Sequence, residues 1–320
     1  MLRAIIIIFS IFFIIAVTTF GWQGFHLMPE FYVQDEALPG RLKKHVVKLS
    51  HEIGDRSVFR HSALTQAAAY IAEEFDKMGL TVEFQKYELH GKETKNVIAR
   101  KPGAKNPDEI IVIGAHYDTC FNPGANDNAS GVAGLIELAR LLSDLENKRT
   151  IKFIAFVNEE PPFFKTENMG SYVYAKSARE ENKDIKAAII LETIGFYSSR
   201  PFSQRYPLLL GPFFPNRANF IAFVGNSTNK EIVNKVKGSF SEHSDFPAAA
   251  IVLFDFVPGV DFSDHWSFWQ FGFPAAMVTD TAFYRYEHYH QSTDTYEKLD
   301  YRAMAAVIEG IKKVLICLAE

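Results

Sequence analysis

The chain has 320 residues, of which 48% are hydrophobic and 22% are charged. This length and composition allow one large globular domain and exclude a disordered chain. The net charge of −4 leaves no basic surplus to neutralise phosphates, so we expect no nucleic-acid partner. The two cysteines, Cys120 and Cys317, are too few for a CxxC metal site or a disulfide framework, and we expect Cys317 to be buried on the apolar face of the last helix.

The first residues predict a membrane segment. Residues 4–20 carry no charge, and a helix over them would just reach across a hydrocarbon core. Arg3 precedes them, which favours an N-terminus in the cytoplasm, and no small-x-small cleavage site follows. We therefore interpret residues 1–22 as a signal-anchor helix rather than a cleaved signal peptide. A membrane-anchored protein is expected, with its catalytic domain periplasmic or extracellular, or a secreted protein if the segment is cleaved.

The rest of the chain is expected to form a linker over residues 23–39 and one catalytic domain over residues 40–320. The apolar spacing over residues 63–78 predicts an amphipathic helix that stops at Gly79, and residues 80–89 alternate like a strand. Short apolar runs suited to buried strands follow at residues 110–115, 151–157, 187–191 and 275–279. Helical patterns lie between them, over residues 132–142, and close the chain over residues 304–318. This alternation predicts a three-layer α/β/α sandwich with a mixed, largely parallel central sheet.

Polar side chains follow each of the four apolar runs, at the edge of the sheet where open α/β folds bind ligands. Two imidazoles and several carboxylates suit zinc or a similar divalent ion. The set is too large for one metal and about right for two, with an aspartate able to bridge them. Each polar cluster alone is a weak signal for a metal site. The prediction rests on the occurrence of all the clusters in this order along the chain. The residues are His116, Asp118, Asp127, Glu159, Glu160, Glu192 and His290.

Five ordered segments resemble one family. They are AHYDT (115–119), GANDNASG (124–131), VNEE (157–160), LETIG (191–195) and YHQSTDT (289–295). They are similar to the co-catalytic zinc aminopeptidases, which include bacterial leucyl aminopeptidases, the aminopeptidase Y type and the glutamate carboxypeptidase group, and to which glutaminyl cyclases are related. Gly54-Asp55-Arg56 and Ser263-Asp264-His265 fit the same pattern, so the resemblance runs from about Ile53 to the C-terminus. It implies the zinc exopeptidase fold and two zinc ions per chain.

The resemblance also implies which residues hold the metals. His116 and Glu192 would bind one metal, Glu160 and His290 the other, and Asp127 would bridge them. The family more often has aspartate at the position of Glu192, so the metal preference of that site stays open.

Three further roles follow from the resemblance. Asp118 would hydrogen-bond to His116 and hold its ring. Glu159 would be the general base for a water held between the metals. Tyr289 would donate a hydrogen bond to the developing oxyanion, although a role as a pocket wall is equally open.

Residues next to these motifs are less certain. Cys120 directly follows AHYDT, but we expect it to be a bystander because the ligand set is already full. Candidates for an apolar side-chain pocket are Phe121, Phe163, Phe164 and Tyr197, although each could equally belong to the core.

The expected activity is removal of N-terminal residues from peptide substrates, because metals and carboxylates would hold a free α-amino group. One alternative is a glutaminyl-cyclase-like acyltransferase that uses one zinc, which the run 161–165 loosely suggests. The other is an inactive, receptor-like ectodomain of the same fold. GANDNASG and YHQSTDT favour the peptidase. Counting bound zinc would distinguish the three readings, because the peptidase would bind two zinc ions, the cyclase one and the inactive ectodomain none.

Overall fold

A computed structural model describes residues 32–207, 211 and 214–320. The expected signal-anchor over residues 1–22 lies outside these residues. Within the described part of the chain, no helix is both long enough and apolar enough to cross a bilayer. The expectation of a membrane-anchored, extracytoplasmic protein is corrected accordingly: the described residues show no membrane anchor.

One eight-stranded sheet forms the centre of the described chain, with the order β1-β2-β4-β3-β5-β8-β6-β7. The middle four strands, β4, β3, β5 and β8, run parallel, whereas β2 and β6 lie antiparallel to their neighbours β4 and β8. β1 and β2 form an antiparallel ribbon at one edge, and β6 and β7 pair in parallel at the other. The strands are β1 Thr81–Leu89, β2 Lys92–Lys101, β3 Asn106–His116, β4 Arg149–Phe156, β5 Asp184–Glu192, β6 Ile221–Asn226, β7 Ala248–Leu253 and β8 Ala275–Thr279.

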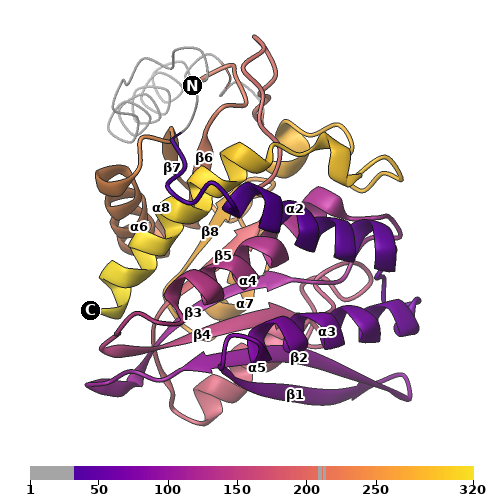
Figure 1. Ribbon diagram of the computed structural model, residues 1–320, viewed down its shortest axis with the longest axis vertical. Coiled ribbons are helices and arrows are strands. Elements are labelled where there is room, and N and C mark those ends of the chain that lie inside the picture. Colours follow the sequence, from indigo (N-terminus) through magenta and orange to yellow (C-terminus); the bar gives the residue numbers. More distant parts are fainter. Residues whose placement is uncertain (1–31, 208–210, 212–213) are drawn as a thin grey trace, which may run out of the picture.

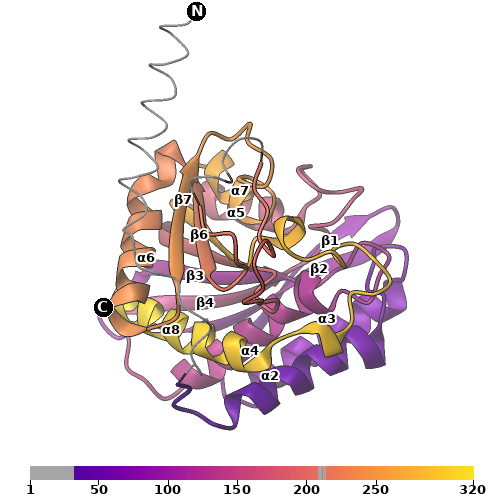
Figure 2. The ribbon, with the colours of Figure 1, turned by 90° about the horizontal axis from the view of Figure 1, so that it is seen from above.

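Helices cover both faces of this sheet. The helices are α2 Leu38–Val47, α3 His61–Asp76, α4 Gly131–Leu142, α5 Gly170–Glu180, α6 Lys230–His243, α7 His265–Gln270 and α8 Tyr301–Ala319. Figures 1 and 2 show α2, α3, α4 and α8 on one side of the sheet and α5 and α7 on the other. The predicted α/β/α sandwich with a mixed sheet is therefore confirmed.

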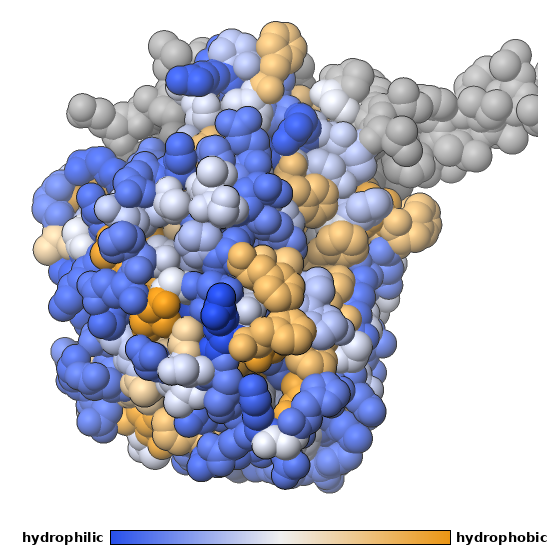
Figure 3. All heavy atoms as spheres, turned by 90° about the vertical axis from the view of Figure 1, so that its right-hand side faces the viewer, coloured by the Kyte–Doolittle hydropathy of each residue, from blue (hydrophilic) through white to orange (hydrophobic). Residues whose placement is uncertain are grey.

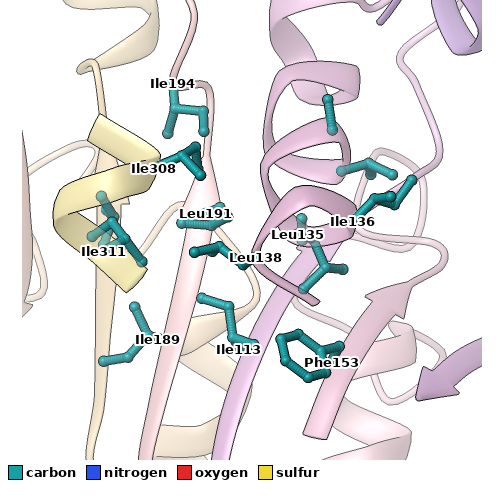
Figure 4. Close-up of a cluster of buried hydrophobic side chains, with 14 of the residues drawn as sticks. Ile113, Leu135, Ile136, Leu138, Phe153, Ile189, Leu191, Ile194, Ile308 and Ile311 are labelled. Carbon is teal, nitrogen blue, oxygen red and sulfur yellow. The ribbon is translucent and has the colours of Figure 1, made fainter. Parts of the chain in front are cut away.

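Among the described residues, the two largest of the three buried apolar clusters follow from the period-2 alternation of the strands. In β3, Ile111 and Ile113 face the larger core, and Ile110 and Val112 face the smaller core with α5 and α7. Figure 4 shows the larger core, where Leu135 and Leu138 of α4 meet Ile308 and Ile311 of α8 over strand residues. Both faces of the central strands are thus buried, which explains their nearly continuous apolar runs.

The ends of the chain differ from two expectations. Val33 and Leu38 are buried in the larger core, and α2 begins at Leu38, so the ordered domain starts before residue 40. Cys317 is exposed on α8 rather than buried. Cys120 and Cys317 are both free thiols.

Candidate metal centre

The carboxyl ends of three parallel strands bring the predicted cluster together. His116 is the last residue of β3, Glu192 is the last residue of β5, and Glu159 and Glu160 come shortly after β4. Parallel strands end at the same edge of a sheet, so residues far apart in sequence meet there. His290 reaches the same place from the loop between β8 and α8, which has positive φ at this residue.

Asp127 lies between the two imidazoles. One carboxylate oxygen, Oδ1, is 3.2 Å from His116 Nε2, and the other, Oδ2, is 3.1 Å from His290 Nε2. Glu192 Oε2 is 3.2 Å from His116 Nε2, and Glu160 Oε2 is 3.2 Å from His290 Nε2. The five predicted ligands therefore form two groups that share one carboxylate, the division that the resemblance implies.

Asp118 holds the glutamate pair rather than the histidine ring. Its Oδ1 accepts a hydrogen bond from the backbone N–H of Glu159 at 3.1 Å, and its Oδ2 accepts from that of Glu160 at 3.0 Å. The expected bond to His116 Nδ1 is longer, at 3.6 Å. Asp118 is fully buried, and through these two bonds it fixes the backbone of the turn that follows β4 and carries both glutamates.

A second set of buried groups positions Asp127, and sequence reasoning did not assign it. Asp294 accepts hydrogen bonds from the backbone N–H groups of Asn126 at 2.8 Å and Asp127 at 3.2 Å, and from the Tyr286 hydroxyl at 2.8 Å. The Asn126 side chain donates to Asp280 at 3.0 Å and accepts from the Gly195 amide at 2.9 Å. Asn126 and Asp294 lie within the motifs GANDNASG and YHQSTDT, and this position was the only sequence signal for their role.

Arg56 anchors the loop that follows β3. Its guanidinium donates to the carbonyl oxygens of Tyr117 at 2.9 Å and Gly124 at 2.9 Å, with further bonds to three other carbonyls. Burial lowers the pKa of Arg56 to about 10, although Asp294 and Asp118 oppose the shift. Arg56, which belongs to the motif Gly54-Asp55-Arg56, therefore holds the backbone of this loop through its carbonyl groups.

Crowded buried carboxylates dominate the electrostatics of the cluster. Burial, helped by the charge of Asp127, raises the pKa of Glu160 to about 8. Burial also raises the pKa of Glu159 and of Glu192, despite the attraction of His116. Burial likewise raises the pKa of Asp264 to about 7. Asp127 behaves differently, because its contacts with both histidines outweigh burial and lower its pKa.

The donor set fits cations. Among the described residues, five buried atoms of the cluster have no hydrogen-bond partner: His116 Nδ1, His116 Nε2, Asp127 Oδ2, Glu160 Oε1 and His290 Nε2. Buried polar atoms are nearly always paired, so this many unpaired donors around one point indicate a missing partner. Imidazole nitrogens and carboxylate oxygens are zinc ligands, and a cation would neutralise the carboxylates that burial otherwise disfavours.

Ser263 holds the side chain of Glu192. Its hydroxyl donates to Glu192 Oε2 at 2.7 Å, and both side chains are buried. This bond fixes one oxygen of the Glu192 side chain close to His116. Ligating carboxylates commonly have such a hydrogen-bond partner.

An apolar pocket of about 80 Å³ opens beside the cluster, with Glu192 and Tyr289 in its wall. The loop between β8 and α8, yellow in Figure 1, lies at the right of that view. Figure 3 looks onto this side, where hydrophobic side chains gather right of the centre in a mostly hydrophilic surface. The apolar lining includes Tyr206, Phe214, Ile251, Leu253, Phe262 and Phe283.

The expected pocket residues do not line this pocket. Tyr197 packs in the larger core against Phe246. Phe121 is exposed and stacks on Phe59, and Phe163 lies against His90. Phe164 contacts the lining residue Phe262 edge to face but does not itself line the pocket. The segment 248–262, which supplies much of the wall, had no sequence motif that marked it. By contrast, Tyr289 does line the pocket, and its ring stacks on His290 with centroids 3.9 Å apart.

Comparison with known proteins places the chain. It is 40% identical over 289 residues to Uncharacterized protein YfbL of Escherichia coli (strain K12), an alignment that covers 87% of this chain and 88% of that protein. It is 26% identical over 224 residues to Leucine aminopeptidase 1 of Ajellomyces dermatitidis (strain ER-3 / ATCC MYA-2586), which covers 65% of this chain. That alignment spans 52% of the fungal protein, so this relative is about twice as long as the part it shares.

Solved structures confirm the fold. BSAP, a zinc aminopeptidase from Bacillus subtilis, superposes with a TM-score of 0.71 at 15% identity and covers 92% of this chain and 97% of its own. A glutaminyl cyclase from Bacteroides thetaiotaomicron superposes with a TM-score of 0.66 at 16% identity, over 90% of this chain and 99% of its own. The sequence profile of Peptidase family M28 matches residues 96–315, which include every predicted ligand, and the chain therefore belongs to Peptidase family M28.

Proposed function

We propose that this chain is a two-zinc aminopeptidase that removes single N-terminal residues from peptides. The observation that carries the proposal is Asp127, whose two carboxylate oxygens face two different imidazoles at 3.2 and 3.1 Å. A carboxylate shared in this way suits a pair of cations, since two metals about 3.5–4 Å apart need a bridging ligand. His116 and Glu192 would hold one zinc, and Glu160 and His290 the other.

The zinc ions would supply Lewis acidity, which polarises a scissile carbonyl and makes hydroxide available near neutral pH. The chain's own groups would do the rest. Glu159 is not needed as a ligand, and its Oε2 lies 3.9 Å from His116 Nε2. It would take the proton of the attacking water at a carboxylate oxygen and return it to the leaving amine. The Tyr289 hydroxyl would donate a hydrogen bond to the carbonyl oxygen as negative charge develops there.

The surroundings favour an amine-bearing, apolar substrate end. Glu159 and Asp264 are buried carboxyl groups beside the cluster, and in their ionised form they would attract a protonated α-amino group. The apolar pocket next to Glu192 and Tyr289 would accept the side chain of the first residue. We therefore expect a preference for aliphatic and aromatic N-terminal residues over charged ones.

A glutaminyl-cyclase-like transferase is the second candidate, favoured by the fold that this chain shares with the Bacteroides thetaiotaomicron enzyme. It would need one zinc rather than two. The second imidazole group around His290 and Glu160 is the feature that argues for the peptidase.

The test combines activity with a metal count. Purified protein is assayed with leucyl, phenylalanyl, lysyl and glutamyl chromogenic amides, with N-acetyl-leucyl amide as the blocked control, and with a peptide that begins with glutamine. Bound zinc is counted in the same sample before and after chelation. We expect two zinc ions, hydrolysis of the leucyl and phenylalanyl amides, no hydrolysis of the acetylated amide, and loss of activity on chelation that zinc restores. One zinc with cyclisation of the glutamine peptide would establish the transferase instead, and an inert zinc-free protein would contradict both.

A further inference from the structure

Cys120 lies at one side of the metal centre. It sits in the loop between β3 and the turn that carries Asp127, and its thiol is free and half-buried. Its Sγ, one carboxylate oxygen of Glu160 and one ring nitrogen of His290 all lie within 4.8 Å of one another. Three donor types that can share a cation therefore converge at this position.

The neighbouring donors point to a ligand at this place. Glu160 is only 3% exposed, and its Oε1 has no hydrogen-bond partner within the part of the chain that the structure describes. In the same part, His290 Nε2 has none either. Arg56 holds the loop backbone on both sides of Cys120, through the carbonyls of Tyr117 and Gly124, so the thiol is presented by a fixed loop.

We propose that Cys120 Sγ is an additional donor to the cation held by Glu160 and His290, an inference that rests on the metal site of the proposed function. On binding, a sulfur–metal bond forms and the thiol proton passes to solvent, with no change of oxidation state. Sulfur with imidazole and carboxylate suits zinc and the softer cadmium ion, and disfavours manganese and magnesium. The position around His116 and Glu192 offers only nitrogen and oxygen, so the two positions differ in the metals that they select.

Cadmium is the probe, because a thiolate bound to it gives a ligand-to-metal charge-transfer absorption in the ultraviolet. The full chain is stripped of metal and titrated with Cd²⁺ as wild type, as Cys120→Ser and as Cys317→Ser. Cys317→Ser is the matched control, since that thiol is exposed on α8. We expect the band in wild type and in Cys317→Ser and no band in Cys120→Ser. Cd²⁺ affinity should fall at least about tenfold in Cys120→Ser, the lower end of what supporting groups of metal sites cost, while Mn²⁺ affinity stays unchanged.

Alkylation gives a second readout that does not depend on cadmium. Metal-free and zinc-loaded wild type are treated with iodoacetamide, and each cysteine is followed by mass spectrometry. Bound zinc should slow the alkylation rate of Cys120 at least about tenfold, the same threshold as for the Cd²⁺ affinity. The alkylation rate of Cys317 should not change. Thermal unfolding of Cys120→Ser and Cys120→Ala confirms that each variant is folded.

A wild-type protein that binds Cd²⁺ without the band, a band that persists in Cys120→Ser, or equal alkylation with and without zinc would each overturn the proposal. Failure of the proposed function is a separate result. Hydrolysis of aminoacyl amides with an unprotected Cys120 refutes only the thiolate, whereas a protected Cys120 in a protein that cleaves no peptide refutes only the peptidase.

Discussion

At the scale of single residues, Glu159 and Glu160 are adjacent but face different partners. Glu160 Oε2 lies 3.2 Å from His290 Nε2, whereas Glu159 Oε2 lies 3.9 Å from His116 Nε2. Asp118 accepts hydrogen bonds from the backbone amides of both glutamates and so fixes the turn that carries them. Their side chains point to different partners from this turn. Under the proposed function, this divergence would let Glu160 bind a metal and Glu159 transfer protons.

We predict that Glu159→Gln keeps bound zinc but loses turnover by about 10²–10⁴-fold, the usual contribution of a general base. The amide has a similar shape and leaves the ligand set intact, but it cannot take a proton from water. Zinc content and kcat on a leucyl amide are measured together. Glu160→Gln is the matched control and should lose zinc as well as activity. Near-normal kcat in Glu159→Gln would remove this residue from the proton-transfer role.

Asp294 acts on the site through the backbone, because it accepts hydrogen bonds from the amides of Asn126 and Asp127. We predict that Asp294→Ala weakens zinc binding by about 10–100-fold, as loss of a supporting carboxylate does. It should also destabilise the fold, by about 1–3 kcal/mol for each buried donor left unsatisfied. Tyr286→Phe is the matched control, because it removes one hydrogen bond to Asp294 and leaves both amides paired. Zinc affinity equal to wild type in Asp294→Ala would show that the turn is held by other contacts.

At the scale of elements, the strands that lead to the site and the edge strand β1 were predictable, whereas β2 and the far edge of the sheet were not. The apolar runs at residues 110–115, 151–157, 187–191 and 275–279 correspond to β3, β4, β5 and β8, because strands covered on both faces are apolar throughout. β2, β6 and β7 were not assigned. β2 begins with exposed polar residues, and β6 and β7 at the far edge carry none of the ligands.

The residues of the site also fall into a predictable and an unpredictable group. Residues at strand ends, such as His116 and Glu192, were predictable because strand ends meet. The partners of these residues depend on loop conformation, which spacing does not specify. For this reason the bonds from Asp118 to the glutamate amides were not predicted, Cys120 was assigned to no role, and the pocket-lining residues Tyr206, Phe214 and Phe283 were not singled out.

Helix packing at the β6 edge of the larger core gives a matched pair of glycine substitutions. A Cβ at Gly310 of α8 would overlap the ring of Phe240 from α6, whereas a Cβ at Gly238 of α6 meets no atom within 4 Å. We predict that Gly238→Ala stabilises the protein by about 0.5–1 kcal/mol, the usual gain over glycine inside a helix. Gly310→Ala should lose about 1–3 kcal/mol through overpacking, which outweighs that gain. Chemical denaturation of both variants is the measurement, and equal stabilisation by both would show that Phe240 moves aside freely.

At the scale of the whole molecule, the fold and the metal centre are built from different residues. The larger core joins α2, α3, α4, α6 and α8 to one face of the sheet, and the smaller core joins α5 and α7 to the other. None of the expected ligands belongs to either core. The protein should therefore fold without metal, but with several buried carboxylates facing one another across the centre.

We predict that metal removal leaves the protein folded but less stable. A ligand that binds only the folded state at about 100 times its Kd contributes about 2.7 kcal/mol. At about 2–4 °C per kcal/mol for a domain of this size, chelation should lower Tm by roughly 5–10 °C. His116→Ala and His290→Ala should reduce bound zinc, keep the circular dichroism spectrum, and show a smaller Tm change on chelation than wild type. Calcium-saturated chelator is the control for effects of the chelator itself. Loss of the circular dichroism spectrum on chelation would show instead that the metals are part of the folding core, and full zinc content in either variant would remove that histidine from the ligand set.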